Sequence, residues 1–192
     1  DILPMGALRG RLIRDLPSGA MLAVRCAASD IVGRLPEDIQ LAAANGPKLC
    51  VVAGPTASVS EFAARLETEG VTTSALHTSH AFHSAMMQPI VGPYVEAMRK
   101  VRFQPARIPI VSTCTGDWLS DADAANPEYW GRHLRMPVLF SNAIAKLLDT
   151  AERVFLEIGP REVLTTLGRQ HVDLPRRDLM IAALGGAAEN PS

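Results

Sequence analysis

The sequence has no long apolar run and no block of like charge. Among its 192 residues, 47% are hydrophobic, but no stretch of about 18 consecutive apolar residues could form a membrane-spanning helix. Lysine plus arginine number 19 and aspartate plus glutamate 20, and no basic cluster could follow the phosphates of a nucleic acid. Arginines in the first 15 residues lie too close together for the apolar core of a signal peptide. We therefore expect a cytoplasmic protein with no membrane and no nucleic-acid partner.

Cysteines and aromatic residues are also scarce. Cys26, Cys50 and Cys114 lie in separate strand-like runs without a CxxC or CxxH spacing, which argues against a zinc site and against a disulfide framework. We expect three buried free thiols. Only 5% of the residues are aromatic, and a composition rich in Ala, Leu and Val is typical of an α/β core.

Strand and helix patterns alternate quickly in the first half of the chain. Residues 5–15 have the spacing of the last turns of a helix, and the next elements have the order βαββαβ of a ferredoxin-like unit. We divide the chain into 1–17, the end of a helix of a larger subdomain; 18–78, a ferredoxin-like small subdomain; and 79–192, the C-terminal part of the larger subdomain. The predicted strands are 19–26, 39–46, 48–55 and 71–78, and the predicted helices between them are 28–36 and 56–70.

After residue 79 the predicted elements are longer and belong to part of a larger α/β unit. Residues 153–170 predict a strand, then a turn at the Gly-Pro pair, and then a helix with Pro160 at or near its first position. The other predicted elements are helices at 84–100, 128–134 and 141–150 and strands at 108–115 and 179–185.

Three of the five histidines, His77, His80 and His83, stand at intervals of three. On a helix His77 and His83 fall on different faces, and on a strand His77 and His80 point to opposite sides, so no local geometry aims all three at one metal ion. Acidic residues do not cluster nearby, and we predict no metal site. A base role at a strand-to-helix junction and a polar junction without chemistry both fit the residues alone.

Four stretches occur in an order and spacing that favour the base role: NGPKLCVVAGP (45–55), SHAFHS (79–84), PEYWGRHLRMPVLF (127–140) and FLEIGPREVL (155–164). The sequence resembles the acyltransferase domain of type I polyketide synthases and, more distantly, the malonyl-CoA:acyl-carrier-protein transacylases of fatty acid synthesis. The resemblance implies transfer of malonyl from malonyl-CoA to the phosphopantetheine thiol of an acyl carrier protein, through an acyl-serine, with no bound cofactor. It also implies a ferredoxin-like subdomain followed by the C-terminal part of an α/β hydrolase-like acyltransferase subdomain.

The resemblance assigns roles to three residues. His83, the second histidine of HAFH, is the catalytic base, and Arg9 holds the free carboxylate of malonyl, for which a planar guanidinium offers two parallel hydrogen bonds. Without the resemblance, Arg9 is a solvated helix residue. Phe82 is the selectivity position, where a bulky ring disfavours the methyl branch of methylmalonyl; its alternative is an ordinary core residue.

Three further residues are assigned to substrate binding on weaker grounds. His80 belongs to the same HAFH element. Asn45 matches an asparagine near the active site in the family, although Asn-Gly-Pro is also an ordinary turn. His133 matches a position whose backbone carbonyl orients the catalytic imidazole in related enzymes, so its own side chain is not required for that task.

The chain lacks the G-x-S-x-G nucleophile motif and the glutamine loop of such enzymes. Ser84 cannot replace the nucleophile, because adjacent residues on a helix point about 100° apart. We expect the serine in an upstream half of the domain, next to a ketosynthase, and we expect the isolated chain to be inactive. The alternatives are a transacylase of fatty acid synthesis and a non-catalytic truncated interaction fragment.

Overall fold

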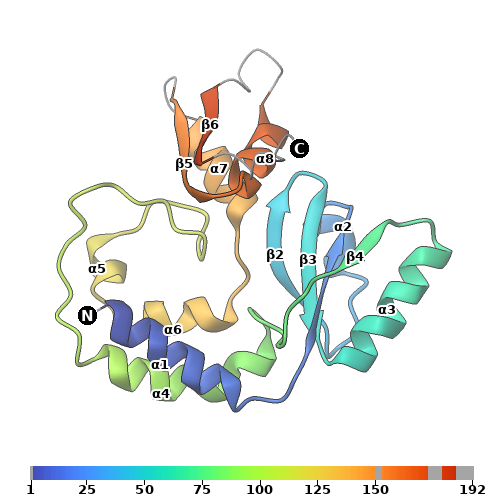
Figure 1. Cartoon of the computed structure of the whole chain (residues 1–192), viewed down its shortest axis with the longest axis horizontal. Helices are drawn as coiled ribbons and strands as arrows, with labels where there is room; N and C mark the ends of the chain where they lie inside the picture. The colour runs from blue at the N-terminus through green and yellow to red at the C-terminus, as the bar shows by residue number, and fades with distance from the viewer. Residues whose placement is uncertain (1, 150–152, 173–178, 185–192) are drawn as a thin grey trace, which may run out of the picture.

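The computed structural model describes residues 2–149, 153–172 and 179–184. A four-stranded sheet with two helices forms one part, and helices with a two-stranded sheet form the rest (Figure 1). The chain enters the four-stranded sheet after helix α1 (Ile2–Arg14) and leaves it before helix α4 (Gln88–Met98). Among the described residues, no helix combines the length and apolar character that a membrane crossing requires.

The first sheet confirms the predicted ferredoxin-like unit. Its strand order is β2-β3-β1-β4, and each pair of neighbours is antiparallel. The last strand, predicted at 71–78, is only three residues long, so the chain that leads to the histidines is irregular from residue 76. The elements are β1 (Ala20–Val24), α2 (Ala28–Val32), β2 (Gln40–Gly46), β3 (Leu49–Gly54), α3 (Thr56–Thr68) and β4 (Thr73–Ala75).

Both faces of this sheet are covered, because successive side chains of a strand point to opposite faces and both sets are apolar in β3. Leu22 and Val52 pack on one face against the buried side chains of α2 and α3, among them Phe62. Met21 and Val51 pack on the other face with Ala and Phe residues of the segment after β4. The boundaries of the small subdomain at 18 and 78 stay a prediction.

The second part is built around three helices that pack together below a small parallel sheet (Figure 1). Ile13 of α1, Ile90 of α4 and Leu134 of α6 share one buried cluster, which holds these helices side by side. The remaining elements are η1 (Ala85–Met87), α5 (Asp121–Ala124), α6 (Pro127–Arg135), α7 (Phe140–Leu148), β5 (Phe155–Pro160), α8 (Val163–Gly168), η2 (Arg169–His171) and β6 (Met180–Leu184).

Two sequence predictions in this part are wrong. Residues 108–115 do not form a strand: a single bridge joins Val111 to Trp118, and Ile108 is 76% exposed. Pro160 ends β5 and does not start a helix, because Arg161 has a φ of 70° and α8 begins two residues later. Residues 150 and 185, the predicted ends of a helix and a strand, lie outside the described residues.

The parallel sheet leaves apolar side chains uncovered. Leu156, Ile158 and Leu184 are exposed, and Ile158 reaches 85%. Parallel sheets in proteins are normally covered on both faces, and two strands alone are rarely stable. The exposed apolar face of β5 and β6 departs from this rule within the described residues.

Candidate functional site

The SHAFHS segment forms a tight turn between β4 and η1. The Phe82 amide donates to the His80 carbonyl at 3.1 Å, and the Ser84 hydroxyl donates to the Ala81 carbonyl at 2.7 Å. His83 has a φ of 58°, in the left-handed region that non-glycine residues seldom adopt. Such backbone strain persists only where the surrounding contacts impose it, and it is common at functional sites.

The imidazole of His83 is oriented by a backbone carbonyl. Its Nδ1 lies 3.0 Å from the carbonyl oxygen of Met136, one of the carbonyls that the end of helix α6 leaves unpaired. A carbonyl only accepts, so Nδ1 carries the hydrogen and Nε2 keeps a lone pair that can take a proton. The resemblance pointed to the backbone carbonyl of His133 for this task, whereas the carbonyl at hydrogen-bonding distance belongs to Met136, three residues further along the chain. A backbone group leaves no trace in the side-chain pattern, so the sequence could not distinguish the two.

Burial also favours the neutral form of this ring. It lowers the pKa of the His83 imidazole below its ordinary value, and the charge of Arg9 acts in the same direction. The backbone carbonyl of Met136 and, to a smaller extent, that of His133 oppose the lowering of this pKa. A neutral imidazole with a free Nε2 is a general base at neutral pH.

Three of the six predicted site residues share one hollow of about 250 Å³. Arg9 comes from α1, His83 from the turn and His133 from α6, and Tyr94, Trp130 and Leu134 complete the lining. A more apolar hollow of about 380 Å³ shares Arg9, Tyr94 and Trp130 with it. A cation and a base thus face the same small space, with apolar surface beside them.

The ring of His133 forms a wall of this hollow. It stacks on Trp130 at 5.5 Å between centroids and meets the edge of Tyr129 at 4.8 Å. Burial is the main cause that lowers the pKa of this imidazole, and the charges of His83, Arg132 and Arg9 lower it further. Its Nε2 is buried and makes no hydrogen bond within the described residues.

The other three predicted residues do not line this hollow. His80 is buried, and its two nitrogens lie within hydrogen-bonding distance of Leu16 and Ser79. Phe82 packs between the sheet and the α1–α4–α6 cluster. Asn45 and Gly46 are part of β2, so that only Pro47 of the predicted Asn-Gly-Pro turn lies outside the strand.

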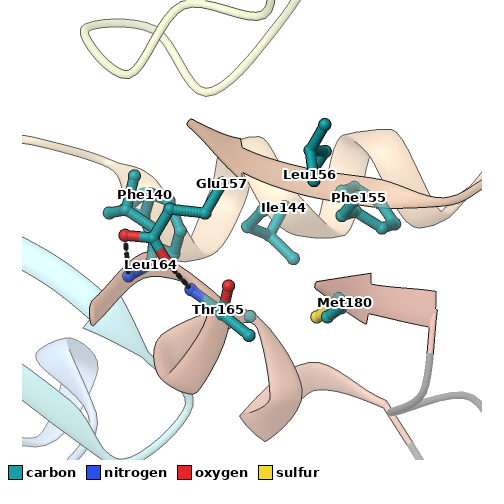
Figure 2. Close-up of a pocket in the computed structure, with 9 residues that line it drawn as sticks. Phe140, Ile144, Phe155, Leu156, Glu157, Leu164, Thr165 and Met180 are labelled. Carbon is teal, nitrogen blue, oxygen red and sulfur yellow. Dashed lines mark hydrogen bonds between the residues drawn. The ribbon is translucent and has the colours of Figure 1, made fainter. Parts of the chain in front are cut away.

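A separate hollow lies under β5 (Figure 2). Glu157, from the EIGP stretch, accepts hydrogen bonds from the amides of Leu164 at 3.1 Å and Thr165 at 2.8 Å, as Figure 2 shows. The hydrogen bond from Thr165, and to a smaller extent the one from Leu164, lowers the pKa of the Glu157 carboxyl. The carboxylate thereby stabilises the first turn of α8. This hollow shares no residue with the one at His83.

The cysteines are free. Sγ atoms of Cys26 and Cys50 lie 4.0 Å apart, and burial raises the pKa of Cys50 to about 12. Cys26 and Cys114 are only half-buried, which differs from the expectation for three buried thiols. Within the described ranges, no group of three or more His, Cys, Asp or Glu side chains could hold a metal ion.

Comparison with known proteins gives consistent matches along the chain. The model of the family described as "Acyl transferase domain" matches residues 3–186. A phenolphthiocerol/phthiocerol polyketide synthase protein of Mycobacterium tuberculosis is 34% identical over 165 residues, which are 86% of this chain and 11% of that protein. The spectinabilin polyketide synthase system protein NorB of Streptomyces orinoci is 38% identical over 173 residues, 88% of this chain and 8% of that protein. The chain thus spans about a tenth of the length of these curated relatives.

A solved structure supports the same comparison. The acyl transferase domain of SpnD, in complex with 2-(pent-4-yn-1-yl)malonyl, superposes on the whole chain with a TM-score of 0.90 and 34% identity. The aligned region is 46% of the SpnD chain. The described fold therefore matches slightly less than half of that solved chain.

Proposed function

Since the chain belongs to the acyl transferase domain family, we propose that it is part of a polyketide synthase domain that transfers malonyl from malonyl-CoA to the phosphopantetheine thiol of an acyl carrier protein. The observation that carries the proposal is the shared hollow of Arg9 and His83. A guanidinium and a neutral imidazole are the two groups that transfer of a carboxylated acyl thioester needs from this part of a domain.

The reaction proceeds by two transfers through an acyl-serine. A serine outside this chain attacks the thioester carbonyl, and Nε2 of His83 takes the proton from its hydroxyl. As the carbon–sulfur bond breaks, the imidazolium returns this proton to the sulfur of CoA. In the second half the thiol of the carrier protein gives its proton to His83 and its sulfur attacks the ester carbonyl. The bond between the carbonyl carbon and the serine oxygen then breaks, and the imidazolium returns the proton to that oxygen, which restores the serine. Arg9 holds the malonyl carboxylate throughout.

Two observations favour this function over the alternatives. Both curated relatives are polyketide synthase proteins, which favours a synthase over a transacylase of fatty acid synthesis. The strained backbone of His83 and the hydrogen bond that orients its ring are features common at active sites, which favours a catalytic domain over a non-catalytic interaction fragment.

The proposal is tested by supplying the missing half of the domain. We expect the 192-residue chain alone to remain unlabelled by radiolabelled malonyl-CoA, because it contains no G-x-S-x-G serine. The same chain joined to an upstream half with that motif should carry about one label per molecule, removable by hydroxylamine. Absence of label in the joined protein, or stoichiometric label on the chain alone, would contradict the proposal.

The rate of acylation should fall at acidic pH with a midpoint below about 6.5, the ordinary pKa of histidine. Burial lowers the pKa of His83, so the ring stays neutral, and accepts a proton, until the pH drops below that lowered value. Single-turnover acylation of the complete domain across pH gives the midpoint. The variant Arg9→Gln should move it upward, because the Arg9 charge contributes to the lowering of this pKa. A midpoint above the ordinary value would contradict the assignment of His83 as the base.

Replacing Phe82 by Ser should raise methylmalonyl transfer relative to malonyl transfer by a factor of about 10. The ring does not line the hollow of Arg9 and His83, but it precedes His83 directly and packs among apolar side chains of two clusters. We expect its removal to open space beside the imidazole into which a methyl branch can extend. The measured quantity is the ratio of the two rates in one preparation, which does not depend on how much protein has folded. An unchanged ratio would show that another residue limits the size of the acyl group.

A further inference from the structure

The two connections between the parts of the protein run side by side. One leaves α1 at residues 15–19, and the other leaves β4 at 76–83. The amide of Gly19 donates to the carbonyl of Ser79 at 3.2 Å. A Cβ at Gly19 would lie 2.8 Å from the Cβ of Ala81 and 2.9 Å from its nitrogen, a separation that only glycine tolerates. The connections are therefore in direct contact.

His80 joins these two connections through its side chain. The residue is 9% exposed, and its Nε2 lies 3.2 Å from the carbonyl oxygen of Leu16. Nδ1 lies 2.8 Å from the hydroxyl oxygen of Ser79. Because the carbonyl can only accept, Nε2 donates to Leu16, and Nδ1 then accepts from Ser79. Both nitrogens are thus engaged with the protein.

Each side of this bridge leads to one functional residue. Leu16 directly extends α1, since its amide donates to the carbonyl of Ile13 at 3.0 Å, and α1 carries Arg9. On the other side, His83 comes three residues after His80 within the hydrogen-bonded turn. Leu16 also packs against the same cluster as Phe82. The bridge therefore connects the helix of the cation to the turn of the base.

We propose that His80 is a positioning residue that fixes the spacing between Arg9 and His83. This inference rests on the proposed function, because the spacing matters only when one acyl group must meet both residues. A malonyl group contacts Arg9 through its carboxylate while His83 serves its thioester end. An acetyl group has no carboxylate and is insensitive to the placement of Arg9. Loss of the bridge should therefore impair malonyl transfer more than acetyl transfer.

The test compares three variants in the complete domain. His80→Leu removes both hydrogen bonds and keeps most of the volume, His80→Gln keeps an N–H donor, and His77→Leu is a control at an exposed position of the same segment. Values of kcat and KM are measured with malonyl-CoA and acetyl-CoA, per active site counted by stoichiometric labelling. We expect His80→Leu to lower kcat/KM for malonyl by about tenfold or more, with a smaller loss for acetyl. His80→Gln should recover most of the difference, and His77→Leu should match the wild type.

A purely structural role predicts a different result. In His80→Leu the values of kcat/KM for malonyl-CoA and acetyl-CoA would then fall by the same factor. Alternatively, neither value would fall once it is expressed per labelled active site. Either outcome would overturn the proposal. Amide hydrogen exchange on the 192-residue chain gives a second measurement that needs no activity. His80→Leu should accelerate exchange at Gly19 and in residues 79–83 together, and unchanged exchange would also overturn the proposal. An inactive wild-type domain with accelerated exchange in the variant would support the bridge and contradict the proposed function.

Discussion

Replacing His83 by Asn in a complete domain should lower the rate of acylation by a factor of about 100 to 10,000. The variant removes the imidazole whose Nδ1 donates a hydrogen bond to the Met136 carbonyl. Asparagine tolerates the left-handed backbone better than alanine does, so the φ of 58° is retained with little added strain. Single-turnover labelling with malonyl-CoA measures the effect directly.

The matched control for this variant is His77→Asn. His77 lies in the same connection but is exposed, and its replacement should leave the acylation rate within about a factor of two of the wild type. Circular dichroism and thermal unfolding verify that both variants fold. Equal losses from the two substitutions would exclude His83 as the base.

Replacing Arg9 by Ala should lower kcat/KM for malonyl-CoA by a factor of about 100 or more, because two charge-assisted hydrogen bonds to a carboxylate are lost and each contributes about 1.5–3 kcal/mol. Transfer from acetyl-CoA should stay within about a factor of three, because acetyl offers no carboxylate to bind. Arg9→Lys should recover only part of the malonyl activity, since an ammonium cannot form the bidentate pair. Steady-state rates with the two thioesters measure both effects.

Arg11 supplies the control on the same helix. It is exposed like Arg9, but residues two apart on a helix point about 200° apart, and Arg11 is not among the residues that line the hollow. Arg11→Ala should therefore leave both rates unchanged. If Arg9→Ala reduces malonyl and acetyl transfer equally, Arg9 does not bind the carboxylate.

Much of the fold follows from local sequence patterns. Strands β2 and β3 and the helix that begins at Thr56 were correctly predicted, because short apolar runs bounded by turn residues indicate buried strands, and an apolar repeat of 3.6 residues indicates a helix. Residues 108–115 show the limit of this reasoning. The stretch alternates apolar residues, but Pro109 has no amide hydrogen to donate, and the described residues offer only one bridging partner, Trp118. A strand depends on a neighbour that a local pattern does not specify.

The site was predicted less completely than the fold. The resemblance selected Arg9, His83 and His133, which the structure brings into one hollow. It pointed to the backbone carbonyl at His133 and not to that of Met136, which lies at hydrogen-bonding distance from the His83 imidazole, because any residue has such a carbonyl. The bridge from His80 depends on a contact across 64 positions of the chain. Such long-range contacts between a side chain and a backbone group have no signature in local spacing.

The contact between Gly19 and Ser79 also bears on how the four-stranded unit could be exchanged between related proteins. The chain enters the four-stranded unit and leaves it at points joined by one 3.2 Å hydrogen bond, which is the geometry of a domain inserted into a host. An exchange of residues 19–78 as a cassette between synthases would keep both junctions at their native separation. Arg9, Phe82 and His83 lie outside the cassette, so the exchange would replace the sheet while the host keeps the three residues to which the proposed function assigns carboxylate binding, selectivity and proton transfer.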